Sequence, residues 1–168
     1  MFTSLAKIIL KSQVSKENFN RKKQFLSWND IKTIALILNS NDKINKSAMD
    51  KFTDNTGKLV TIFYVETSSK TPTYGDWLCF TKKNRNVFGF PSEKNLTGIK
   101  KTPYDLAINT SDETDLFSSS LISSLQATLK AGNGKSSNVY DLIIKKGDPH
   151  HVIDYLNEVI KYLKMIRT

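Results

Sequence analysis

The chain contains two unbroken apolar runs, Thr33-Ile-Ala-Leu-Ile-Leu38 and Leu59-Val-Thr-Ile-Phe-Tyr-Val65. Neither run alternates between polar and apolar residues, and this pattern is typical of strands that are covered on both faces. Between them the sequence predicts a helix over residues 43–55, with Gly57 at its C-cap. A strand, a helix and a second strand in this order form a βαβ unit, whose two strands run parallel.

The same alternation continues along the chain. Further strands are predicted at Trp77–Phe80, Tyr104–Asn109, Ala127–Ala131 and Tyr140–Lys145. A helix is expected at Thr114–Gln126, with Ser111 or Asp112 as its N-cap. A last helix is expected to begin at Asp148-Pro149, because Asp is a favoured N-cap and Pro is favoured at the first helical position. The sequence therefore predicts an α/β fold, a Rossmann-like three-layer domain with a mostly parallel sheet and a basic N-terminal helix.

Length and composition fit one domain with its own core, since the 168 residues are 39% hydrophobic. The single cysteine, Cys79, excludes a disulfide framework and a Cys-based zinc site. No apolar run approaches the roughly 18 to 20 residues that span a bilayer, so we expect a cytoplasmic protein. The residues expected in the buried sheet are Leu36, Ile62, Ile108 and Ile143.

The net charge of +9 is concentrated near the N-terminus. Residues 1–28 hold six Lys and Arg side chains against one Glu, so we divide the chain into a basic arm, residues 1–28, and a domain, residues 29–168. On a helical wheel Lys7 and Lys11 project opposite an apolar stripe formed by Phe2, Leu5, Ala6, Ile9 and Leu10. Such a helix lies on a membrane or a partner, docks on its own domain, or pairs with a second copy as a homodimer.

Basic residues of this kind attract polyanions, so the expected partners are a protein, a ribonucleoprotein or an anionic membrane surface. The alternative is that the lysines serve only solubility. The candidates for polyanion binding are Lys7, Lys11, Arg21, Lys22, Lys23, Lys82, Lys83 and Arg85.

Polar side chains follow the predicted strands. In open parallel sheets ligands bind beyond the carboxyl ends of the strands, which predicts a crevice at this edge. The alternative is that these polar residues only form the turns that follow the strands. The crevice candidates are Asn39, Asp42, Thr110, Ser111 and Asp112.

Motifs that would carry known chemistry are absent or incomplete. Gly132-Asn-Gly-Lys-Ser136 resembles the end of a phosphate-binding loop, but Leu129 stands where that loop needs its first glycine. No G-x-G-x-x-G follows the first strand, which disfavours an NAD-type dehydrogenase. His150 and His151 are adjacent and so cannot form the i, i+4 metal pair of a helix. We therefore expect no metal, no cofactor and no catalytic residue.

The order of segments resembles an uncharacterised bacterial family of unknown function over nearly the whole chain. The resemblance rests on residues 30–38, 77–83, 87–91, 104–109 and 140–144 together with the two terminal helices. It supports the fold and supplies no activity. Residues 104–132 also resemble, more weakly, the N-terminal half of heptosyltransferase-like glycosyltransferases. Those enzymes need a second domain, which 168 residues do not provide. The resemblance implies that Asp42 is the residue nearest an acid–base role.

These observations favour a binding or adaptor module that contacts a polyanion through its basic arm. The alternative is a small sugar-nucleotide-binding or glycosyltransferase-like protein that uses the crevice at the strand ends.

Overall fold

The computed structural model describes residues 2–42, 44–68, 74–112, 114–134, 138–147 and 151–167, without the side chains of residues 2 and 3. Within this part of the chain a single sheet has the strand order β3-β2-β1-β4-β5-β6, and every neighbouring pair is parallel. This order is the one found in Rossmann folds. The strands are β1 (Thr33–Asn39), β2 (Leu59–Val65), β3 (Leu78–Phe80), β4 (Pro103–Asn109), β5 (Gln126–Gly132) and β6 (Leu142–Ile143).

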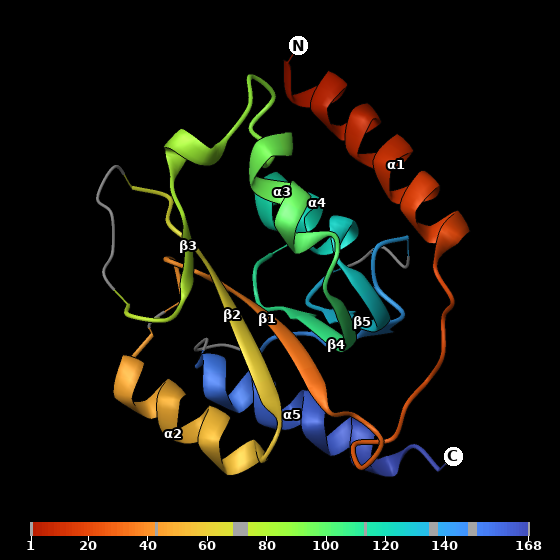
Figure 1. The fold of residues 1–168 in the computed structure, drawn as a ribbon, viewed down its shortest axis with the longest axis vertical. Coiled ribbons are helices and arrows are strands. Elements are labelled where there is room, and N and C mark those ends of the chain that lie inside the picture. Colours follow the sequence, from red (N-terminus) through yellow and green to blue (C-terminus); the bar gives the residue numbers. More distant parts are fainter. Residues whose placement is uncertain are drawn as a thin grey trace.

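Helices cover both faces of the sheet (Figure 1). In β1, Ile34, Leu36 and Leu38 pack on the face that carries α2 and α5, whereas Ala35 and Ile37 pack on the face that carries α3 and α4. Because successive side chains of a strand point to opposite faces, one unbroken apolar run supplies two cores. The predicted three-layer fold is confirmed. The helices are α1 (Phe2–Asn20), α2 (Lys46–Thr56), α3 (Glu93–Ile99), α4 (Leu116–Ser124) and α5 (Val152–Met165), with a 3-10 helix η1 (Lys82–Asn84).

The ends of α2 and α4 show how the sequence limits the helices. The side chain of Asn45 accepts a hydrogen bond of 3.1 Å from the backbone amide of Ala48 and caps α2. At its other end Gly57 adopts φ 62°, a left-handed conformation that favours glycine, so the predicted C-cap is confirmed. The N-cap of α4 is Asp115, and the prediction of Ser111 or Asp112 was wrong because the helix begins later, at Leu116.

Two further features differ from the prediction, and one predicted helix start is not tested. The last strand is limited to Leu142–Ile143 at the sheet edge, and Ile143 is therefore half-buried, whereas the other three predicted core residues are buried. The short helix α3 was not predicted, because its seven residues give little helical periodicity. Helix α5 begins at Val152 with His151 as N-cap, and the predicted start at Asp148-Pro149 lies outside the described residues.

Helix α1 packs against α4 on the outside of the molecule (Figure 1). The side chains of Ala6 and Val14 are buried in this contact. The amide of Gln13 donates to the hydroxyl of Ser124 at 2.7 Å and accepts from that of Ser120 at 2.9 Å. Small serines on α4 let the two helices approach closely. The N-terminal helix thus docks on its own domain, while the division of the chain at residue 28 stays a prediction.

Candidate functional site

The five crevice candidates lie together at the carboxyl ends of β1 and β4. The chain leaves these two neighbouring strands in opposite directions, and ligands of Rossmann folds bind at such a point. The cavity between them has a volume of about 130 Å³. Its lining comprises Asn39, Asn41, Asp42, Thr110, Ser111, Asp112, Thr114, Asp115 and Lys146.

A buried ion pair between Asp42 and Lys146 forms one wall of this crevice. The two side chains are only 5% and 6% exposed. Thr110 Oγ1 donates a hydrogen bond of 2.6 Å to Asp42 Oδ2, and the backbone amide of Asn39 donates to the same oxygen at 3.1 Å. Sequence reasoning missed Lys146, although it follows the last strand and so belongs to the same polar edge. The charge of Asp42 is thus neutralised within the protein.

Asp115 closes the N-terminus of α4. Its Oδ1 accepts hydrogen bonds from the backbone amides of Phe117 at 3.1 Å and Ser118 at 3.2 Å. Its Oδ2 accepts from the hydroxyl of Ser118 at 2.7 Å and from the side-chain amide of Asn39. A helix N-terminus attracts anions through its free amides, but here a carboxylate of the chain already occupies them. A phosphate group would meet negative charge at this position.

Size and charge together limit what the crevice can bind. Small-molecule sites typically have volumes of about 300 to 1,000 Å³, well above that of this cavity. Of its predicted residues, Asp112 is exposed and accepts a hydrogen bond of 2.8 Å from Asn133. Among the described residues no group of three or more His, Cys, Asp or Glu side chains is placed to hold a metal ion. The crevice is thus smaller than a typical small-molecule site, and a sugar nucleotide at the strand ends stays a prediction.

The outer side of α1 carries apolar residues that the fold does not bury. Leu5 is 46% exposed, Ile8 is 63% exposed and Phe19 is 91% exposed. Within the predicted apolar stripe Ala6 is buried and Ile9 is half-buried, whereas Leu5 is exposed. The side chain of Phe2 lies outside the described residues.

The predicted basic residues of the arm separate into two groups. Lys7, Lys11, Lys22 and Lys23 are exposed. Arg21, by contrast, is buried in an ion pair with a carboxylate of the domain. Its guanidinium already has an anionic partner, so we leave it out of the proposed contact surface. Lys16, which sequence reasoning counted in the charge excess but did not select, is also exposed.

The second basic segment follows β3. Lys82 and Lys83 form most of η1 and are exposed. The guanidinium carbon of Arg85 lies 5.0 Å from the ring centroid of Phe117, so this side chain covers the start of α4. In Figure 1 η1 and the N-terminal end of α1 both lie in the upper part of the molecule. Lys7, Lys11, Lys82 and Lys83 are thus all exposed to solvent.

Comparison with known proteins gives one match. A family model described as "Family of unknown function (DUF6913)" covers residues 3–166. No curated protein and no solved structure matches the chain. The predicted resemblance to a family of unknown function is confirmed, whereas the similarity to heptosyltransferase-like glycosyltransferases is not shown. No described helix is both long enough and apolar enough to cross a membrane.

Proposed function

The chain belongs to the DUF6913 family of unknown function, and we propose that it is a binding module that contacts an anionic membrane surface through α1. The contact is made by the α1 outer face, which we define as Leu5, Ile8 and Phe19 together with Lys7, Lys11 and Lys16. Anionic lipids line the cytoplasmic leaflet of membranes, so the proposal includes a cytoplasmic location.

One observation carries this proposal, namely that α1 exposes apolar residues although its other side is docked. At about 100° per residue, Leu5, Ile8 and Phe19 fall within an arc of about 60°. The lysines lie on both sides of this arc. An apolar stripe with flanking cations is the pattern of helices that lie in the plane of a membrane interface.

The energies favour a lipid surface over a nucleic acid. Full burial of a Leu, Ile or Phe side chain is worth about 1.5 to 3 kcal/mol, and a Lys near an anionic surface contributes about 1 kcal/mol. The phosphate backbone of a nucleic acid would bind only the lysines and would leave Leu5 and Ile8 in water. Contact with a membrane uses both kinds of residue, and it is expected to be weak and reversible because the stripe is short.

Vesicle sedimentation tests the proposal. We expect the protein to bind phosphatidylcholine vesicles that contain about 30% phosphatidylglycerol, and to bind much less to vesicles of phosphatidylcholine alone. Leu5→Ser combined with Ile8→Ser should weaken binding by at least about tenfold, since two apolar contacts are lost. Leu59→Ser is the matched control, because Leu59 is also exposed and lies at the start of β2.

The alternatives give different results in the same series. Binding to single-stranded RNA that is lost with Lys7→Gln and Lys11→Gln but not with the apolar double variant would replace the membrane by a ribonucleoprotein. A dimer in light scattering that dissociates with the apolar double variant would assign α1 to a homodimer interface. If the apolar double variant and the variant with Lys7→Gln and Lys11→Gln both bind anionic vesicles as well as the parent protein does, α1 is not the contact.

A further inference from the structure

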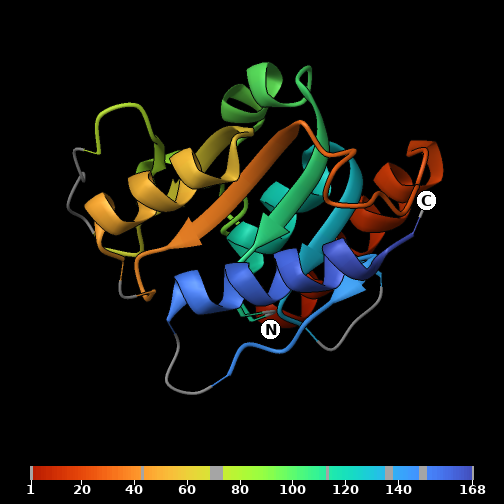
Figure 2. The ribbon, with the colours of Figure 1, turned by 90° about the horizontal axis from the view of Figure 1, so that it is seen from below.

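We propose that a groove between α2 and α5 binds an acidic amphipathic helix of a partner protein. The two helices lie side by side on the same face of the sheet, opposite the face that carries α3 and α4 (Figure 2). The groove between them has a volume of about 450 Å³. It lies across the sheet from α4 and α1, so a helix bound here would leave the α1 outer face free.

Each wall of the groove is one stripe of a helix. On α5, Ile153, Ile160 and Lys164 are spaced by seven and four residues and so share a face. This stripe is separate from the one that buries Leu156 and Val159 under the sheet. Helix α5 therefore has an apolar side that its own domain does not use completely.

The floor of the groove is apolar and accessible. Phe52 on α2 and both Ile153 and Ile160 on α5 are half-buried, and each packs against the core while part of its surface remains open. Trp28 lies at the floor, with the ammonium of Lys58 5.1 Å from its ring centroid. Apolar side chains of a partner helix would cover this floor and remove it from water.

The charges at the rim define the partner. Among the described residues, the charged side chains that line the groove are Lys51 and Lys164, both exposed. A hollow that adjoins the groove at Trp28 and Lys164 adds the cation Arg167. The acidic Glu158 on α5 is bound to Lys161 at 3.2 Å and does not line the groove. The complementary ligand therefore carries carboxylates beside its apolar residues.

A second copy of this chain does not fit that description. Its α1 outer face is apolar, but it carries lysines that would meet Lys51 and Lys164. The net charge of +9 also opposes association between copies. A helix with apolar residues at i, i+4, i+7 and i+11 and with Glu or Asp beside them matches both the floor and the rim.

A designed peptide tests this assignment on the full chain. The probe is a labelled helical peptide of about 18 residues with Leu at i, i+4, i+7 and i+11 and Glu at the flanking positions. One matched peptide replaces each Glu by Lys, and another replaces each Leu by Ser. Fluorescence anisotropy should show binding of the first peptide at about 1 to 100 µM and at least tenfold weaker binding of the other two.

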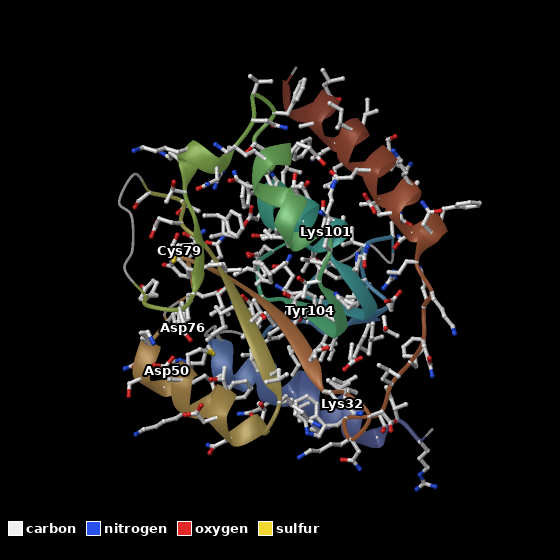
Figure 3. The ribbon with its side chains drawn as sticks, viewed as in Figure 1. Lys32, Asp50, Asp76, Cys79, Lys101 and Tyr104 are labelled. Atoms are coloured by element: carbon white, nitrogen blue, oxygen red, sulfur yellow. The ribbon has the colours of Figure 1, made fainter. Side chains whose placement is uncertain are left out.

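Charge reversal on the protein then locates the site. Lys51→Glu combined with Lys164→Glu should weaken binding of the Glu peptide by at least about tenfold. Lys94→Glu combined with Lys101→Glu is the matched control, because both lysines are exposed. Lys94 lies in α3 on the opposite face of the sheet, and Lys101 lies away from α2 and α5 (Figure 3). In NMR spectra the side-chain amides of Asn55 and Asn157, which line the groove, should shift on binding.

Three results would overturn the proposal. The first is that the Glu peptide does not bind at about 1 mM. The second is that the two charge-reversal variants lose the same peptide affinity, and the third is that the NMR signals of Asn55 and Asn157 do not shift when the peptide binds. Since the four lysines of these variants are exposed, loss of folding does not explain a difference between them. Membrane binding through α1 is measured separately, so a groove that does not bind the peptide would not change the conclusion about the membrane.

Discussion

Arg21 binds Asp141 through two hydrogen bonds of 2.6 Å, one from each terminal nitrogen of the guanidinium to each carboxylate oxygen. Both side chains are only 7% exposed. Burial alone would raise the pKa of Asp141, but the hydrogen bonds from Arg21 and from the backbone amide of Lys130 lower it below its ordinary value. The pair joins the segment after α1 to the segment before β6, and so fixes the helix that carries the proposed contact surface.

We expect Arg21→Ala to lower the free energy of unfolding by about 3 kcal/mol, because buried Asp141 loses both hydrogen bonds from Arg21 and keeps only Lys23, 3.5 Å away, as a cationic partner. Urea unfolding followed by circular dichroism measures the loss. Lys22→Ala is the control, since Lys22 is exposed, and it should change stability by less than about 0.5 kcal/mol. Equal losses in the two variants would contradict a structural role for the Arg21–Asp141 pair.

The sequence predicted the parts of this fold that depend on local pattern. β2 was predicted to the residue, and β1 within one residue, because an unbroken apolar run is typical of a strand that is covered on both faces. The five crevice candidates lie at one edge of the sheet because parallel strands end at the same edge, while their binding of a ligand stays a prediction. β6 was predicted too long, because apolar composition alone does not reveal that a strand lies at an edge.

Tertiary contacts determined what the sequence did not reveal. Lys146 pairs with Asp42 across 104 positions of the chain, and no local pattern links them. For α1 the sequence left open whether its apolar stripe contacts a membrane or partner, its own domain or a second copy, and only the position of α4 determines which side is buried. The groove between α2 and α5 likewise depends on the distance between two helices.

The pair of Asp42 and Lys146 gives a second prediction. Lys146→Met should cost about 3 to 5 kcal/mol, because Asp42 then remains buried with hydrogen bonds from Thr110 and Asn39 but no counterion. Replacement of both residues, by Asp42→Leu with Lys146→Met, should cost clearly less than the two single changes together. Chemical denaturation of the three variants measures this coupling. Additive losses would show that the two charges do not depend on each other.

Lys130 predicts a dependence of stability on pH. Its side chain is buried, and its ammonium donates a hydrogen bond of 2.9 Å to the carbonyl oxygen of Ser123. Burial lowers the pKa of Lys130 to about 7, and the positive charge of Arg21 contributes in the same direction. Between about pH 7 and pH 10.5 the unfolded chain therefore keeps a proton that the folded protein releases.

The sign of the effect follows from this proton. Above the ordinary lysine pKa, Lys130 is neutral in both the folded and the unfolded state, and its burial carries no cost of charge. As the pH falls toward 7 the unfolded chain gains a proton that the folded protein does not, so the free energy of unfolding falls; it should therefore rise with pH across this interval. Lys130→Met should remove that rise and should be more stable than the parent protein at pH 7 and below. Urea unfolding of both proteins at matched pH values measures the difference. Parallel pH profiles would contradict a depressed pKa for Lys130.

Gly132, at the end of β5, gives the last prediction. A Cβ atom added here would overlap the ring of Tyr140, whose hydroxyl accepts a hydrogen bond of 2.8 Å from the side-chain amide of Asn109. Gly132→Ala must displace this ring, and it should cost about 1 to 3 kcal/mol for overpacking and about 1 kcal/mol more if the hydrogen bond breaks.

Gly98→Ala is the matched control for Gly132→Ala, and we expect it to change stability in the opposite direction. Gly98 lies in α3, and a Cβ atom added there would meet no atom within 4 Å, so Gly98→Ala should stabilise the protein by about 0.5 to 1 kcal/mol through helix propensity. Thermal unfolding of the two variants compares the same chemical change in two surroundings. A small destabilisation at Gly132 would mean that the Tyr140 ring moves at little cost, and the side-chain amide of Asn109 would then be held through its oxygen by the backbone amide of Ser111 at 3.1 Å.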